Sequence, residues 1–166
     1  MKLTEGEKTD MIRKRGDFMA VLDTEAFLDA VCAMVAEGKA NVPVPIRGIS
    51  MRPFLYDGDY AYLSPLPGKI KKGDILLFQR ENRQYVLHRV YKTRRDGSLL
   101  MLGDSQVTAE PVAAHQLRAK ASFVRRGGKD CPPGSFRWWL FAHVWRILAP
   151  LRPQIIKARA LFRRKS

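Results

Sequence analysis

The chain has 166 residues, of which 46% are hydrophobic and 28% are charged. This length suits one domain with a single core and short appendages, and the composition excludes a disordered protein. The formal net charge of +14 favours a polyanionic partner, either nucleic acid or an anionic membrane surface.

The first part of the chain, residues 1–41, is expected to be a polar segment followed by one helix. The polar segment has no apolar stretch of the length that a signal peptide needs, so we expect no export signal. Asp23 or Thr24 can cap the helix, which should end near Glu37, just before Gly38. Apolar residues recur at helical spacing and are expected to pack on the main domain: Phe27, Leu28, Val31, Met34 and Val35.

A β domain is predicted over residues 42–126, where short apolar segments alternate with Gly, Pro and Asp. Gly-Asp pairs precede two of these segments, and Asp96-Gly97 is a strong hairpin signal. The sequence GGKDCPPGS over residues 127–135 predicts a linker. The expected strands are 42–47, 59–64, 74–80, 84–92, 98–102 and 117–124.

The last part, residues 136–166, is aromatic and basic, and we expect an amphipathic helical tail. Residues 136–149 number only 14 and include two arginines and His143, so they are too short and too charged to span a bilayer. Residues 125–166 contain eleven Lys and Arg against one acid. Tryptophan beside arginine favours a helix lying on an anionic membrane surface. Packing against a partner protein or the domain itself is the second interpretation. Nucleic-acid binding is the third, because the basic residues alternate with Leu and Ile.

The compartment is expected to be reducing, because Cys32 and Cys131 lie far apart and give no disulfide framework and no metal-ligand spacing. No run of about 20 apolar residues is present to span a bilayer. We therefore expect a peripheral protein on the cytoplasmic side of a membrane, with no metal and no cofactor.

A candidate nucleophile, Ser50, lies in the sequence GISMRP at residues 48–53. A nucleophilic serine needs a tight, exposed backbone position, which Gly48 permits two residues earlier. Met51 and Pro53 give a hydrophobic support and a fixed φ. Taken alone, the same residues are also common turn chemistry.

Three further segments follow the serine in order: KKGDILLF at 71–78, LHRV at 87–90 and LGDS at 102–105, with Glu110 six residues after Asp104. Together with GISMRPFLYDGD, they resemble the type I signal peptidase superfamily, which includes the self-cleaving repressors of the SOS response. The resemblance covers roughly residues 44–124. Bacterial members place a lysine where this chain has His88, whereas the endoplasmic-reticulum type has histidine there.

The resemblance implies that Ser50 is the nucleophile and His88 the general base. It also implies an orienting acid after the Gly-Asp turn, for which Asp104 is the first choice and Glu110 the second. Elementary chemistry agrees, because a serine hydroxyl needs a base within hydrogen-bond reach and a neutral imidazole can accept its proton. A carboxylate on the other ring nitrogen would fix the tautomer. His115, in a polar loop, and His143, in the tail, are weaker candidates.

The sequence departs from the signal-peptidase pattern at three places. After the Gly-Asp turn the family normally reads Gly-Asp-Asn-Asn with an aspartate six residues beyond the first, whereas this chain has Ser105, Gln106 and Glu110. Gly48 stands where signal peptidases usually carry a serine that assists the oxyanion hole, so backbone N–H groups, including that of Ser50, would have to supply the donors. The usual N-terminal anchor is also missing, which argues against a signal peptidase of the usual topology.

The sequence therefore predicts a mainly β fold with a signal-peptidase/repressor-like core. The expected function is a serine endopeptidase that cleaves a peptide or pre-protein, bound as an extended strand, through an acyl-enzyme on Ser50. A self-cleaving regulator is one alternative, but the residues ahead of Ser50 offer one helix and no helix-turn-helix unit. A non-enzymatic binding module of the same fold is the other. We expect a peptide or protein substrate and an anionic membrane surface as partners, and no nucleic acid.

Overall fold

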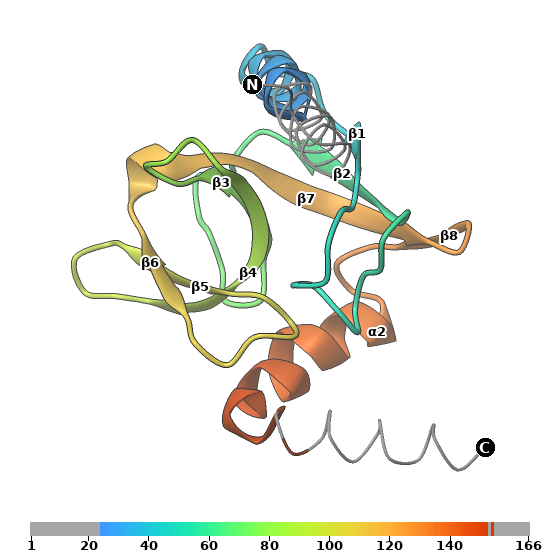
Figure 1. The fold of residues 1–166 in the computed structure, drawn as a ribbon, viewed down its shortest axis with the longest axis vertical. Helices are drawn as coiled ribbons and strands as arrows, with labels where there is room; N and C mark the ends of the chain where they lie inside the picture. The colour runs from blue at the N-terminus through green and yellow to red at the C-terminus, as the bar shows by residue number, and fades with distance from the viewer. Residues whose placement is uncertain (1–23, 153, 155–166) are drawn as a thin grey trace, which may run out of the picture.

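The computed structural model describes residues 24–152 and 154, and over this range the chain is mainly β, as expected (Figure 1). Eight strands form one antiparallel sheet in the order β1-β2-β7-β3-β4-β5-β6, with β8 paired to β7. Figure 1 shows the helical C-terminal part crossing one end of this sheet. The strands are β1 (Val42–Pro45), β2 (Tyr60–Ser64), β3 (Ile75–Gln79), β4 (Tyr85–Thr93), β5 (Leu99–Leu102), β6 (Glu110–Val112), β7 (Leu117–Arg126) and β8 (Lys129–Cys131), and a short 3-10 turn, η1 (Ala114–Gln116), precedes β7.

The six expected strands correspond to β1–β5 and β7, and the predicted hairpin between β4 and β5 is confirmed. In that hairpin Asp96 Oδ1 accepts a hydrogen bond from the Ser98 amide at 2.9 Å, as its turn chemistry predicts. The sequence did not predict β6 and β8, which have three residues each and offer too short a pattern to detect. β8 lies within residues 127–135, the segment expected to be a linker, and pairs with β7.

β3 lies in the middle of the sheet and is buried on both faces, because it separates two hydrophobic cores. Ile75 and Leu77 point into the larger core, whereas Leu76 and Phe78 point into the smaller one, as the alternation of a strand requires. The smaller core lies among β3–β6 and is formed by Leu76, Phe78, Val90, Leu99, Met101 and Val112.

The expected N-terminal helix is present over residues 24–36. Its inner face buries Val31 and Val35 in the larger core. At its outer side the Tyr85 hydroxyl donates to Asp29 Oδ1 at 2.5 Å. Asp23 and the polar segment before it lie outside the described residues.

The C-terminal helical segment, which we define as residues 136–152, packs against the sheet domain. It consists of α2 (Phe136–Leu140), a π-helical turn η2 (Phe141–Trp145) and a 3-10 turn η3 (Ala149–Leu151). The rings of Trp138 and Phe141 lie 5.7 and 5.0 Å from that of Phe54, which is fully buried. Residues 153 and 155–166 of the expected tail lie outside the described part. Across the residues that the structure describes, no helix has the length and apolarity needed to cross a membrane.

Gly73, two residues before β3 begins, gives a test of this packing. An added Cβ would lie 2.6 Å from Ala142 Cβ, so Gly73→Ala should displace the C-terminal helical segment and lower the free energy of unfolding by about 3 kcal/mol. Urea denaturation measures the loss. Gly97→Ala is the matched control, because its φ of +81° is also positive but its added Cβ meets nothing within 4 Å. This control should lose only about 1 kcal/mol. Equal losses in the two variants would contradict the packing.

Candidate active site

Ser50 lies in the tight loop between β1 and β2, as the sequence predicts. Gly48 adopts a φ of +88°, and its amide donates to Asp57 Oδ1 at 3.0 Å. Met51 and Phe54, which follow the serine, are buried in the larger core and anchor the loop to it. The Ser50 side chain itself is only half-buried and lines a cavity.

The carbonyl of Ser50 is held by the turn between β5 and β6. The amide and the hydroxyl of Ser105 both donate to it, at 2.9 and 3.1 Å. A Cβ on Gly103 would lie 2.6 Å from the same oxygen, so only glycine fits there. The LGDS segment therefore holds the loop that carries Ser50 through the backbone and the side chain of Ser105.

This turn, residues 103–106, is in turn held by the C-terminal helical segment. Trp145 Nε1 donates to the carbonyl of Asp104 at 2.7 Å. The guanidinium of Arg152, which is 1% exposed, donates to the carbonyls of Gly103 and Gln106 at 2.8 and 2.6 Å. No feature of the sequence pointed to these two residues, because the contact spans about 40 positions or more along the chain.

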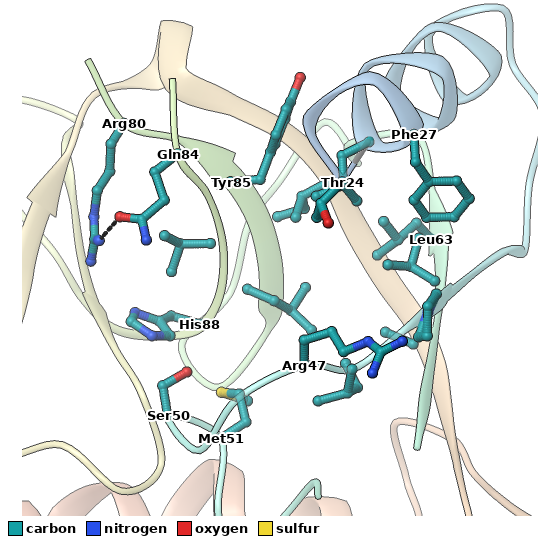
Figure 2. Close-up of a pocket in the computed structure, with 18 of the residues that line it drawn as sticks. Thr24, Phe27, Arg47, Ser50, Met51, Leu63, Arg80, Gln84, Tyr85 and His88 are labelled. Atoms are coloured by element: carbon teal, nitrogen blue, oxygen red, sulfur yellow. Dashed lines mark hydrogen bonds between the residues drawn. The ribbon is translucent and has the colours of Figure 1, made fainter. Parts of the chain in front are cut away.

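His88 lies in β4 with its ring 1% exposed and 6.0 Å from the ring of Phe78. Its Nδ1 lies 3.3 Å from Glu110 Oε1, but the ring is not aligned for a hydrogen bond, and Nδ1 makes none with the described residues. With Nδ1 on the Glu110 side, Nε2 is the ring atom available to a serine. Figure 2 shows the Ser50 side chain and the His88 ring facing each other at one edge of the cavity.

Glu110 is bound by an arginine that the sequence did not single out. Arg80, just after β3, donates from Nε and Nη2 to the two oxygens of Glu110 at 2.8 and 2.7 Å. Its Nη1 donates to Gln84 Oε1 at 2.5 Å, which fixes the guanidinium in the turn between β3 and β4 (Figure 2). The structure thus brings Arg80, Glu110 and His88 into one row that ends at Ser50.

Asp104, the first choice for the orienting acid, is paired with an arginine and not with His88. Its carboxylate forms a buried, two-point ion pair with Arg89 at 3.0 and 2.8 Å. Arg89 also donates to the carbonyl of Gly73 and lies 4.7 Å over the ring of Phe54. The structure therefore pairs Asp104 with Arg89 and places Glu110, the second choice, beside His88.

The electrostatics of the row favour a neutral imidazole beside an ionised carboxylate. Burial lowers the pKa of His88 to about 4, and Glu110, which raises this pKa, only partly offsets the effect. The hydrogen bonds from Arg80 hold the pKa of Glu110 below its ordinary value. Because unfolded histidine accepts a proton near pH 6.5, the unfolded state binds more protons as the pH falls from about 6.5 to 4, and the fold loses stability over this window.

Beside Ser50 and His88 opens a cavity of about 600 Å³. Its walls come from β1, β2, β4 and the N-terminal helix, and they are mainly apolar, with Leu63 and Phe27 at the far end (Figure 2). The amide N–H of Ser50 makes no hydrogen bond within the described part of the chain.

The other two histidines lie away from this cavity. His115 is exposed and lies 3.5 Å from Glu81, and His143 stacks on Trp139 at the surface. Between residues 24 and 154, as far as the structure describes them, no three His, Cys, Asp or Glu side chains form a group that could hold a metal ion.

Comparison with known proteins gives one family. The family described as Peptidase S24-like matches residues 13–124. This span includes Ser50, His88 and Glu110, and it ends within β7, before the C-terminal helical segment. The match agrees with the resemblance to SOS-repressor-like serine peptidases. Neither a search of curated proteins nor a search of solved structures found a match.

The depressed pKa of His88 can be measured directly. The ring resonances should titrate with a midpoint near pH 4, because burial disfavours the imidazolium. Arg80→Gln should raise the midpoint, since it removes a positive charge that disfavours protonation. NMR titration of the histidine ring protons gives both values. Arg83→Gln is the control, because that arginine pairs with Glu25 instead and should leave the midpoint unchanged. A wild-type midpoint near 6.5 would contradict the electrostatics.

Proposed function

The chain belongs to the Peptidase S24-like family, and from this premise we propose that it is a serine endopeptidase with Ser50 as nucleophile and His88 as general base. The observation that carries the proposal is the row Arg80–Glu110–His88, which ends beside Ser50 at the edge of an apolar cavity. A neutral imidazole supported by an ionised carboxylate is the arrangement that activates a serine hydroxyl.

The first step of the proposed reaction forms an acyl-enzyme. Ser50 Oγ attacks the carbonyl carbon of the scissile peptide bond while its proton passes to Nε2 of His88. The tetrahedral oxyanion is stabilised by backbone N–H groups, among them that of Ser50, which makes no hydrogen bond with the described residues. When the C–N bond breaks, the imidazolium gives its proton to the leaving amine.

The second step releases the acyl group. Water takes the place of the leaving peptide and gives a proton to His88 as its oxygen attacks the ester carbonyl. Breaking the ester bond frees the carboxylic acid, and His88 returns the proton to Ser50 Oγ. Both steps need an imidazolium for a short time, and the negative charge of Glu110 stabilises it against the burial that lowers the pKa of His88.

The substrate in this proposal is a peptide or pre-protein segment in extended form. Its side chain nearest the cut, or one close to it, would occupy the apolar cavity beside His88, where burial of apolar surface favours binding. Signal-peptidase-like processing, with histidine in place of the lysine base, is the finer version of the same proposal.

A fluorophosphonate probe tests the nucleophile. The probe should label the wild-type protein covalently, because an activated serine attacks its phosphorus. Ser50→Ala should abolish labelling, and His88→Ala should slow it by about 1,000-fold. Labelled protein is quantified by mass spectrometry. Ser98→Ala, which changes a half-buried serine of the β4–β5 hairpin, is the control and should label normally. Equal labelling of Ser50→Ala and the wild type would refute the assignment.

The two carboxylates can be separated by their variants. Glu110→Gln should slow probe labelling by about 100-fold or more, because it removes the charge that stabilises the imidazolium. Asp104→Asn should instead lower the free energy of unfolding by about 3 kcal/mol, because it leaves the buried Arg89 without its ion pair. Labelling rates and urea denaturation are measured for both variants at a temperature where each is folded. The reverse pattern would return the orienting role to Asp104.

A further inference from the structure

The C-terminal helical segment has two different faces. Its inner face is buried against the domain through Trp138, Phe141 and Ala149. Its outer face exposes large apolar side chains, of which Phe136 is 75% and Ile147 64% exposed. Within the described residues, five of the nine exposed large hydrophobic side chains lie in this one segment: Phe136, Trp139, Val144, Ile147 and Leu151. We name these five residues the outer ridge.

The aromatic part of the outer ridge forms a stack of rings. The ring of Phe136 stacks on that of Trp139 at 6.2 Å, and Trp139 stacks on His143 at 5.5 Å. His143 Nδ1 also contacts the carbonyl of Trp139 at 3.0 Å. The stacked rings present a preformed apolar surface with polar ring atoms, which is the property that places Trp at a membrane interface.

The arginines of the segment keep the outer ridge turned away from the domain. Arg137 donates to the carbonyls of Pro53 and Phe54, and Arg146 donates to the carbonyl of Tyr91. Because these guanidinium groups, like that of Arg152, bind the protein itself, the outer ridge faces outward as an apolar surface.

The sequence after this segment is basic, which favours an anionic partner. Residues 153–166 contain five Lys and Arg and no acid: Lys157, Arg159, Arg163, Arg164 and Lys165. An apolar ridge followed by such a basic stretch complements a surface that offers hydrocarbon and negative charge together.

We propose that the outer ridge docks this protein on an anionic lipid bilayer, with the basic residues 153–166 adding electrostatic attraction. The apolar side chains enter the headgroup region while the segment lies in the plane of the interface. A second copy of the chain fits less well, because a symmetric contact would bring two basic stretches together. Nucleic acid fits less well too, because the arginines of the segment bind protein carbonyls.

Vesicle co-sedimentation of the full chain tests the proposal. Vesicles containing about one third phosphatidylglycerol in phosphatidylcholine should bind the wild type, and pure phosphatidylcholine vesicles should bind it at least tenfold more weakly. The double variant Trp139→Ser/Ile147→Ser should bind anionic vesicles at least tenfold more weakly than the wild type. The matched control is Tyr60→Ser/Val107→Ser, which removes two exposed apolar side chains elsewhere and should bind normally.

Thermal unfolding and sedimentation velocity complete the design. Both double variants should unfold like the wild type, since all four side chains are exposed. Equal binding of the ridge variant and the wild type to anionic vesicles would overturn the proposal, as would equal binding of the wild type to the two vesicle types. A wild-type dimer that the ridge variant converts to a monomer would assign the ridge to a second copy instead.

Discussion

The site depends on the hydrogen bonds by which the turn 103–106 holds the carbonyl of Ser50. They join the loop after β1 to the turn after β5, two segments more than fifty residues apart, and they need a glycine at 103 and a donor at 105. Two hydrogen bonds fix the oxygen of Ser50, so the fold itself holds the backbone of the loop that carries Ser50. In the proposed reaction a preorganised loop favours catalysis more than a mobile one would, because the entropy cost of ordering the loop is already met when the protein folds.

Two consecutive residues of β4, His88 and Arg89, contact different carboxylates. His88 and Arg89 point to opposite faces of the strand, as its pleat requires. Arg89 binds Asp104 within the larger core and stabilises the turn from which Ser105 acts. His88 turns the other way, toward Glu110 and the cavity. The alternation of a single strand therefore separates the structural carboxylate from the one that can assist an imidazole.

Much of this was predictable from local sequence, and the rest depended on distant contacts. Strand alternation and Gly-Asp turns are local signals, so β1–β5 and β7 were found, whereas the three-residue strands carry no period. Ser50 and His88 were singled out as residue types in a recognisable order, and the structure places both beside one cavity. The choice between Asp104 and Glu110 depended on which arginine each one meets, Arg89 or Arg80, and spacing along the chain holds no such information.

The sequence also could not show which face of the C-terminal helical segment is buried, because its aromatic residues are of the same type. The fold shows that Trp138 is buried and Trp139 is exposed. The inner face, through Trp145 and Arg152, supports the turn that holds Ser50. This support comes from outside the span that matches the Peptidase S24-like family. The C-terminal helical segment thus supports, through one face, the turn that holds the carbonyl of Ser50, and it exposes an apolar ridge on the other face. Any partner that moves the ridge would therefore act on a segment that is hydrogen-bonded, through one turn, to the loop that carries Ser50.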